Sequence, residues 1–338
     1  MISGYEIEEK IAETSRSAIY KAYETGVSKS PIVIKALKAI RMSEHSKDQL
    51  MQRIERLKVL DHALLIVPGY IGVKDGVFYI TRDYYDGVTL DNLAEGFSEM
   101  GLKAFLPVAC QLAHALDLIH KAGIVHGGIK PHNILINPQT YEIRIIDFIS
   151  SLDIKSVSHF IHDPSFVRDT LSYTSPEQTG RINHRVGFAS DLYSLGIVFY
   201  EMLTGCLPFF SVDPLELIHS HLAQEAPPVH EVKPGIPIVL SRITAKLMHK
   251  EPGKRYKSPA GLLTDLTRCK NEYEAAGTIS QFPPDSRTGP RWGSFVSKMV
   301  GRDRETGEIV AEYEKAAAGE FRSMFISGLP GIGKTRLI

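Results

Sequence analysis

The sequence predicts an α+β protein in two unequal parts, a small β-rich part followed by a larger and mainly helical one. Residues 5–38 form short runs that alternate apolar and polar side chains, as half-buried strands do. From residue 102 onward the apolar positions instead recur at helical spacing. With 338 residues and 43% hydrophobic side chains, the chain is long enough for more than one folding unit.

The composition argues against several classes of partner. Lysine plus arginine equals aspartate plus glutamate at 39 each, so the charge balance indicates neither nucleic acid nor an anionic membrane as a partner. The N-terminus MISGYEIEEK does not resemble a signal peptide, and no uninterrupted apolar run reaches the length that crosses a bilayer. Cys110, Cys206 and Cys269 lack the paired spacing of a disulfide framework or zinc site. We therefore expect a cytoplasmic protein.

The first part reads as a sheet interrupted by one helix. The runs YEIEEKIAE, SAIYKAYE and PIVIKAL predict three strands, and ALLIVPGYIGV and GVFYITRDYY predict two more around an Asp75-Gly76 turn. Between these groups, Ser43–Leu60 places Leu50, Ile54, Leu57 and Leu60 at helical spacing.

The second part reads as a helical lobe followed by a linker. A helix is predicted from Leu102 to Lys121, ending before a capping Gly123. DLYSLGIVFYEMLTG and IPIVLSRITAKLMHK predict further helices. Residues 276–298 are rich in Pro, Gly and Ser and lack periodicity. The expected boundaries are 1–85, 86–275, a linker at 276–298, and a new unit at 299–338.

Three separated motifs occur in a specific order. They are Val33-Ile34-Lys35, then a loop from His126 to Asn133, then Asp147-Phe148-Ile149 after a buried strand. This ordered set resembles the protein kinase family over roughly residues 5–270, and the order is far more specific than any single motif. The resemblance implies a bilobal fold, with a β-rich N-lobe carrying one helix and a larger helical C-lobe.

The resemblance implies a nucleotide site in the first lobe. Lys35 corresponds to the strand lysine that neutralises the inner phosphates of ATP, and Glu55 on the next helix to its ion-pair partner. Arg82 stands at the gatekeeper position beside the adenine pocket, which it could restrict unless it reaches solvent.

The loop at 126–133 departs from the family pattern at two positions. Gly127 and Gly128 replace the arginine that pairs with a phosphorylated activation loop and the aspartate that serves as the base. Glycine has no side chain with which to accept a proton, so no catalytic residue set is intact. Lys130 and Asn133 are retained, and in active relatives they hold the transferred phosphoryl group and a Mg²⁺ ion.

The metal and phosphate contacts are partly altered. Asp147 and Asn133 remain as Mg²⁺ ligands, but Ile149 replaces a glycine whose backbone freedom a β-branched residue lacks. Ala12, Thr14 and Ser17 replace the three glycines of the phosphate-covering loop and hinder close backbone approach to phosphate. Ser15, Arg16 and Ser17 could supply substitute contacts. ATP and Mg²⁺ are thus possible ligands whose binding is expected to be weak or absent.

Positions that hold the family's scaffold are better kept. Glu177 and Arg255 resemble the buried ion pair of the large lobe, and Asp191 resembles the helix-start aspartate that caps the catalytic loop. We expect His126 to brace that loop. The neighbouring histidines do not converge on a metal site by spacing; they are His114, His120 and His132.

A further motif lies near residue 338. The segment after Met324-Phe325-Ile326 matches the Walker A pattern of P-loop ATPases, and its phosphate-binding residues are Gly328, Gly331, Gly333, Lys334 and Thr335. The earlier Val300-Gly301-Arg302-Asp303 resembles the start of AAA-type or signal-transduction ATPase domains. Because no second strand supplies a Walker B carboxylate, we expect the truncated start of an ATPase domain. This combination resembles bacterial multidomain kinase–ATPase–sensor histidine kinase regulators.

Three hypotheses about function follow from these motifs. The first is a pseudokinase that regulates an adjacent ATPase domain or a protein partner. The second is an active or weakly active serine/threonine kinase, which the retained Lys35 and Asp147 favour. The third is a scaffold that binds no nucleotide, which the missing phosphate-loop glycines and Arg82 favour.

Overall fold

The computed structural model describes residues 4–14, 17–26, 30–37, 51, 54–60, 62–74, 77–93, 101–148 and 170–286, together with residues 308, 311, 312, 315 and 319. The chain divides into two compact units, residues 1–290 and 291–338. Several predictions fall outside the described residues: the Walker A segment, Ser15 and Arg16 of the phosphate loop, Asp75-Gly76, Ile149, and most of the Ser43–Leu60 helix.

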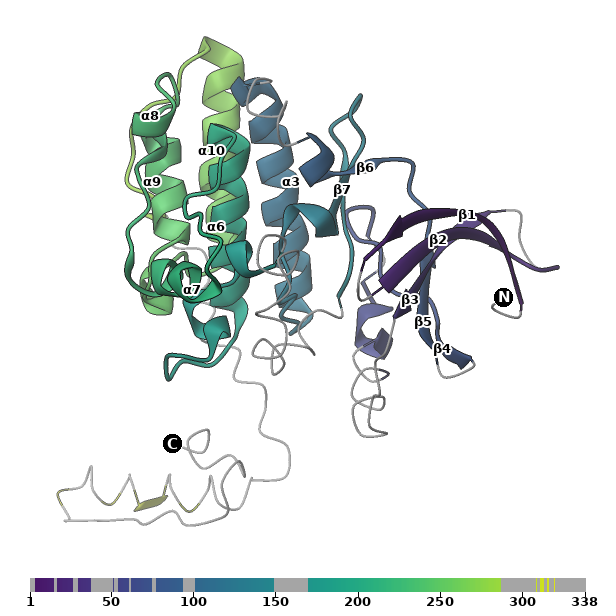
Figure 1. The fold of residues 1–338 in the computed structure, drawn as a ribbon. Coiled ribbons are helices and arrows are strands. Elements are labelled where there is room, and N and C mark those ends of the chain that lie inside the picture. The colour runs from purple at the N-terminus through teal and green to yellow at the C-terminus, as the bar shows by residue number, and fades with distance from the viewer. Residues whose placement is uncertain are drawn as a thin grey trace. The chain divides into compact units, whose positions relative to one another are not determined.

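The N-lobe is an antiparallel sheet, as predicted (Figure 1). Its strands, in spatial order, are β1 (Tyr5–Glu13), β2 (Ser17–Glu24), β3 (Pro31–Leu37), β5 (Val77–Asp83) and β4 (Ile71–Lys74). Lys35 lies opposite Ile80, and Val33 lies opposite Arg82. Because directly opposed side chains share a face of a sheet and alternate residues return to it, these four side chains belong to one face.

The described part of the predicted helix packs on that same face. Ile54 is buried together with Phe78 and Ile80 of β5. Leu57, one turn further along the helix, is buried in the larger core of the protein. The helix therefore contacts both the sheet and the C-lobe.

A second, three-stranded sheet carries the motifs of the C-lobe. It consists of β6 (Val88–Thr89), β7 (Ile134–Ile136) and β8 (Ile143–Ile145), with short 3-10 helices at Leu90–Leu93 and Pro131–Asn133. The predicted strand before Asp147 is thus confirmed as β8. Its isoleucines, Ile143 and Ile145, are fully buried and fix where the following loop emerges.

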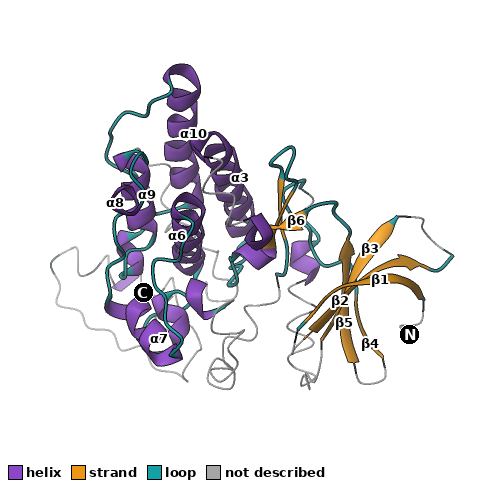
Figure 2. Ribbon diagram, turned by 45° about the horizontal axis from the view of Figure 1, so that its top comes forward, coloured by secondary structure: helices purple, strands orange, loops and turns teal. Residues whose placement is uncertain are grey.

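The rest of the C-lobe is helical (Figure 2). Its helices are α3 (Gly101–Lys121), α6 (Phe188–Thr204), α7 (Pro214–Ala223), α8 (Val229–Val232), α9 (Ile238–Leu247) and α10 (Pro259–Ala276). Short 3-10 helices at Leu171–Tyr173, Pro176–Thr179 and Pro252–Lys254 lie between them. Gly123 follows α3 with φ 73°, a left-handed conformation that favours glycine and matches the predicted cap.

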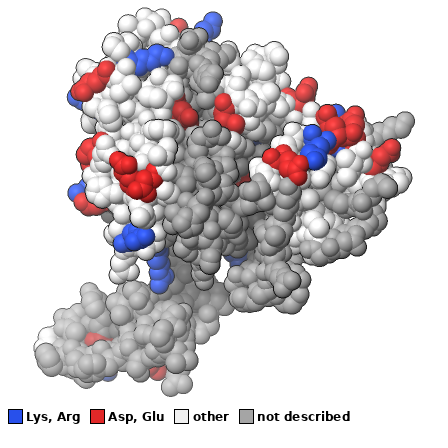
Figure 3. Space-filling view, viewed as in Figure 1, with Lys and Arg blue, Asp and Glu red and all other residues white. Residues whose placement is uncertain are grey.

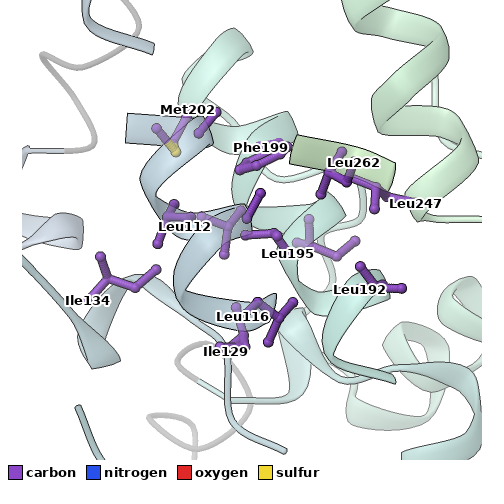
Figure 4. Packing of buried hydrophobic residues seen from close by; sticks show 14 of the residues in the cluster. Leu112, Leu116, Ile129, Ile134, Leu192, Leu195, Phe199, Met202, Leu247 and Leu262 are labelled. Carbon is purple, nitrogen blue, oxygen red and sulfur yellow. The ribbon is translucent and has the colours of Figure 1, made fainter. Parts of the chain in front are cut away.

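Helix α6 forms the centre of the hydrophobic core. Leu195 and Phe199 of α6 pack with Leu112 and Leu116 of α3 in one cluster (Figure 4). A side-chain carbon at Gly196 would lie 2.8 Å from Leu247, so glycine permits the close approach of α6 to α9. Within the described residues, α3 is long and apolar enough to cross a membrane, but most of it is buried in this core.

The beginning of the predicted linker packs on the C-lobe. Phe282 is buried, and the Arg268 guanidinium lies 4.2 Å from the centre of its ring. The backbone N–H of Asp285 donates to Asp265 of α10 at 2.7 Å. Residues 277–286 lack helix and strand, as their composition predicts, yet one aromatic anchor and local hydrogen bonds hold them in place. On the face shown in Figure 3, acidic and basic side chains of the described residues lie interspersed.

Candidate active site

Asp191 holds the loop that carries the site. From the first turn of α6 its carboxylate accepts hydrogen bonds from the backbone N–H groups of His126 (2.8 Å) and Gly127 (2.7 Å). His120 Nε2 lies 2.8 Å from the same carboxylate. Burial by itself raises the pKa of Asp191, but the hydrogen bond and charge of His120 outweigh burial and lower it. Asp191 thus remains an anionic anchor for the loop, as its position in the sequence predicts.

The two glycines of the loop have different backbone requirements. Gly127 has φ 71°, in the left-handed region, whereas Gly128 has no positive φ. The carbonyl of Gly127 accepts a hydrogen bond from Gln178 Nε2 at 3.0 Å, and that of Gly128 accepts one from Asn133 Nδ2 at 2.8 Å. The loop is therefore fixed through its backbone, and the base position has no side chain.

Two retained residues complete the loop. Lys130 Nζ donates to Thr170 Oγ1 at 2.9 Å, which ties the loop to the segment that precedes Glu177. Asn133 uses its amide nitrogen to hold Gly128, so its carbonyl oxygen is the atom that would contact a metal ion. His126 braces the loop, as predicted: its ring bonds the N–H of Gly128 at 3.2 Å and the carbonyl of Ile146 at 3.1 Å.

Lys35 and Asp147 form the central ion pair of the site. Lys35 Nζ lies 2.7 Å from Asp147 Oδ2 and joins the N-lobe sheet to the loop after β8. Asp147 has φ 65°, a left-handed conformation that aspartate tolerates better than most residues. Burial raises the pKa of Asp147, but the charge and hydrogen bond of Lys35, aided by Lys130 and His126, lower it to about 2.

The predicted ion pair between Lys35 and Glu55 is wrong. Glu55 pairs with Lys58 at 2.6 Å, and 62% of its side chain is exposed. Ile54 and Leu57 take the buried face of the helix, and Glu55 lies about 100° around the helix from Ile54. The helical face thus directs Glu55 to solvent, and Asp147 is the partner of Lys35.

Arg82 is partly buried on β5, and its environment is unusual for a cation. Its Nη1 is buried and has no hydrogen-bond partner in the described part of the chain. Burial lowers the pKa of Arg82 to about 10, against the opposing effect of the charge on Asp147. The guanidinium therefore stays charged at neutral pH. The sequence leaves open whether Arg82 restricts the adenine pocket or reaches solvent, and its Nη1 does not reach solvent.

The phosphate-loop positions bond to one another. Ala12 lies within β1, and Thr14 and Ser17 flank the turn to β2. The N–H of Thr14 donates to the Ser17 carbonyl at 2.8 Å, and the N–H of Ser17 donates to Thr14 Oγ1 at 3.0 Å. Both N–H groups are thus used within the turn, so this pair offers phosphate less than a glycine-rich turn does.

The site nevertheless has groups that fit a magnesium–nucleotide complex. Asp147 and the carbonyl oxygen of Asn133 are hard oxygen ligands of the kind that Mg²⁺ prefers. Lys35 is a cation suited to phosphate, although Asp147 holds it at 2.7 Å. When bound, ATP would supply the transferable phosphoryl group and Mg²⁺ would neutralise its charge. For the described residues, no group of three metal-ligating side chains converges, and the histidines have separate partners.

The predicted scaffold ion pair is present. Arg255 donates to both carboxylate oxygens of Glu177 at 2.7 and 3.0 Å, and both side chains are buried. Arg255 also donates to the backbone carbonyls of His249, Ala189 and Lys250. Every nitrogen of the guanidinium is thus used.

Comparison with known proteins agrees with this geometry. The family model of the protein kinase domain matches residues 5–264, so the chain belongs to the protein kinase family. The chain is 31% identical over 270 residues to the "Probable serine/threonine-protein kinase" of Clostridium acetobutylicum, covering 80% of this chain and 40% of that protein. It is also 28% identical to hybrid signal transduction histidine kinase G of Dictyostelium discoideum, covering 72% of this chain and 10% of that protein.

Solved structures share the fold. The kinase domain of Mycobacterium tuberculosis PknI superposes with a TM-score of 0.60 at 18% identity, over 79% of this chain and 96% of that one. The bilobal fold, with its β-rich N-lobe and helical C-lobe, is thus the one predicted. The chain spans two fifths or less of the length of the curated relatives named above.

Proposed function

We propose that the domain is a catalytically impaired protein kinase, a pseudokinase that acts in signalling through its conformation. The observation that carries this proposal is Gly128: hydrogen bonds with side chains hold the loop around it in place, yet the base position has no carboxylate. A positioned base contributes on the order of 10² to 10⁴ in rate, so its absence leaves at most slow transfer.

Nucleotide binding is part of the proposal. Lys35, Asn133 and Asp147 supply a phosphate-binding cation and two metal ligands, in a family that generally uses ATP and Mg²⁺. The self-bonded Thr14–Ser17 turn argues that binding is weaker than in an active kinase. If no nucleotide bound under any condition, the scaffold hypothesis would replace this one.

The test is restoration of the base. Gly128 has no positive φ, so Gly128→Asp introduces a side chain without backbone strain. With labelled Mg-ATP and a generic protein substrate, we expect wild type to transfer little phosphate and Gly128→Asp to transfer about 10² times more or above. The double variant Gly128→Asp/Asp147→Asn is the matched control and stays inactive. Robust phosphorylation by wild type would instead favour the active-kinase alternative, which the retained Lys35, Lys130 and Asp147 support.

We further propose that residues 299–338 begin a P-loop ATPase domain that this kinase-like domain regulates in the cytoplasm. The Walker A match at Gly328–Thr335 supports the assignment. The similarity to a hybrid histidine kinase, of which this chain matches 10%, supports a multidomain setting. In a longer protein that contains the whole ATPase domain, Lys334→Ala should abolish ATP hydrolysis, and unchanged hydrolysis would contradict the assignment.

A further inference from the structure

The charges around Asp147 differ from those of a site that depends on a divalent cation. Lys35 contacts its carboxylate directly, and the charges of Lys130 and His126 also act on it. Arg82 experiences the charge of Asp147 from the sheet above. Among the described residues, no second carboxylate acts on either Asp147 or Arg82. Gly128 supplies none, and Glu55 points to solvent.

Arg82 is placed to act with Lys35. Lys35 lies opposite Ile80, so Arg82, two residues along β5, is its diagonal neighbour on the same face. Diagonal neighbours in an antiparallel pair are about 7–8 Å apart, a span that one polyphosphate can bridge with two long cationic side chains. Lys35 and Arg82 thus lie on one face of the sheet, the face that Asp147 contacts through Lys35.

The buried guanidinium nitrogen indicates a missing anion. Arg82 Nη1 is buried and without a partner among the described residues, and arginine does not escape this cost by losing its proton at neutral pH. A buried donor without an acceptor costs free energy that a ligand oxygen restores. Planar guanidinium groups match phosphate and bind it through paired, charge-assisted hydrogen bonds.

We propose that Arg82 binds the phosphates of a nucleoside triphosphate together with Lys35 and Lys130, so that this cleft does not require a divalent cation to bind the nucleotide. This inference rests on the proposed nucleotide binding and assigns its mode. In an active kinase, Mg²⁺ neutralises the phosphates beside acidic side chains. Here protein cations take that role, because the base carboxylate is replaced by Gly128 and an arginine is added.

Asp147 then competes with the ligand for Lys35. Asp147 contacts Lys35 at 2.7 Å, so this ion pair must break before Lys35 can bind phosphate. Without a metal ion between them, the Asp147 carboxylate and the phosphate also repel each other. Asp147→Asn removes that competitor while asparagine tolerates the left-handed backbone at this position. The variant should therefore bind ATP more tightly in EDTA, the opposite of its effect in a Mg²⁺-dependent site.

The experiment is calorimetric titration of the 338-residue chain with ATP, in excess EDTA and in Mg²⁺. The Lys334→Ala background excludes binding by the Walker A segment. We expect Kd values in the two buffers within about tenfold of each other. Arg82→Met should weaken ATP binding in EDTA by about tenfold to a hundredfold, the worth of a hydrogen bond to a charged group. Arg82→Lys should retain part of the affinity, and the exposed Arg242→Met is the matched control.

The outcomes separate the two proposals. Binding by the parent chain only in Mg²⁺ would overturn metal-independent binding and leave the pseudokinase proposal intact. Equal or tighter ATP binding by Arg82→Met in EDTA would show that Arg82 merely fills the pocket, and would also overturn this inference. Inorganic tripolyphosphate should compete with ATP in EDTA, and failure to compete would contradict recognition through phosphate. Thermal unfolding of each variant checks that loss of binding is not loss of folding.

Discussion

At the scale of single residues, the two glycines of the loop are not equivalent. Gly127 has φ 71° and Gly128 does not have a positive φ. A side chain in the left-handed region costs about 1–2 kcal/mol, so Gly127→Ala should lower the free energy of unfolding by about that amount. Gly128→Ala is the matched control and should change it by less than about 0.5 kcal/mol. Urea unfolding followed by circular dichroism measures the stability of both variants. Equal losses would contradict the difference in backbone conformation between Gly127 and Gly128.

For Arg82, also at the scale of single residues, we expect a substitution to raise the free energy of unfolding and not to lower it. Its buried Nη1 has no hydrogen-bond partner among the described residues, which lowers the free energy of unfolding. Arg82→Met replaces it with an apolar side chain of similar length, and we expect the free energy of unfolding without nucleotide to rise by about 1 kcal/mol. Arg242→Met on the exposed face of α9 should leave stability unchanged. A destabilised Arg82→Met protein would show that the guanidinium is already well accommodated.

The sequence predicts the role of a residue well where a motif fixes the backbone, and poorly where the role depends on which face of a helix is buried. Asp191 and His126 hold the loop as expected, because a motif of fixed spacing fixes their neighbours. The resemblance implies Glu55 as the partner of Lys35, but the burial of Ile54 and Leu57 sets the helix rotation and turns Glu55 to solvent. The burial of Arg82 Nη1 without a hydrogen-bond partner in the described part of the chain depends on tertiary packing, which no local pattern encodes.

At the scale of elements, the Glu177–Arg255 ion pair joins three segments of the C-lobe. Arg255 links the 3-10 helix at Pro176–Thr179 to the first turn of α6 and to the carbonyls that follow α9. Burial raises the pKa of Glu177, but the hydrogen bond and charge of Arg255 lower it below its ordinary value. Breaking such a pair leaves a buried charge without its partner.

Glu177→Gln should therefore cost about 3–5 kcal/mol of stability. The neighbouring Glu251–Lys254 pair has a similar separation of 2.7 Å but is exposed, so Glu251→Gln should cost less than about 1 kcal/mol. Denaturant midpoints of the two variants, measured in parallel, test the difference. Similar midpoints would mean that Glu177 does not anchor the lobe.

The elements themselves could largely be predicted, because their periodicity is strong. The alternating runs become strands of the five-stranded sheet, and the helix expected at Leu102–Lys121 is α3 with one added residue. The packed segment 277–286 could not be predicted as ordered, since a single buried Phe282 and side-chain bonds to α10 leave no periodic pattern. Order there comes from tertiary contact and not from local propensity.

At the scale of the whole molecule, the fold keeps the scaffold of a kinase and changes its charge balance. The ion pair of Lys35 with Asp147 joins the two lobes. We expect the pH dependence of stability to arise elsewhere, from ionisable groups buried around α6 and α7 in the C-lobe. His221 of α7 is fully buried there, with Nδ1 3.0 Å from the Tyr193 hydroxyl.

His221 should make the molecule lose stability below neutral pH. Burial, and to a lesser extent the nearby charge of Lys250, lowers its pKa from 6.5 to about 3. At a pH between these two pKa values, His221 is protonated in the unfolded chain but not in the folded protein. The free energy of unfolding therefore falls as the pH falls below about 6.5. From pH 7 to pH 5 this group alone removes about 2 kcal/mol. His221→Gln should flatten that dependence in urea titrations at successive pH values, whereas exposed His219→Gln on the same helix should retain it. An equally steep loss in His221→Gln would assign the acid sensitivity to other groups.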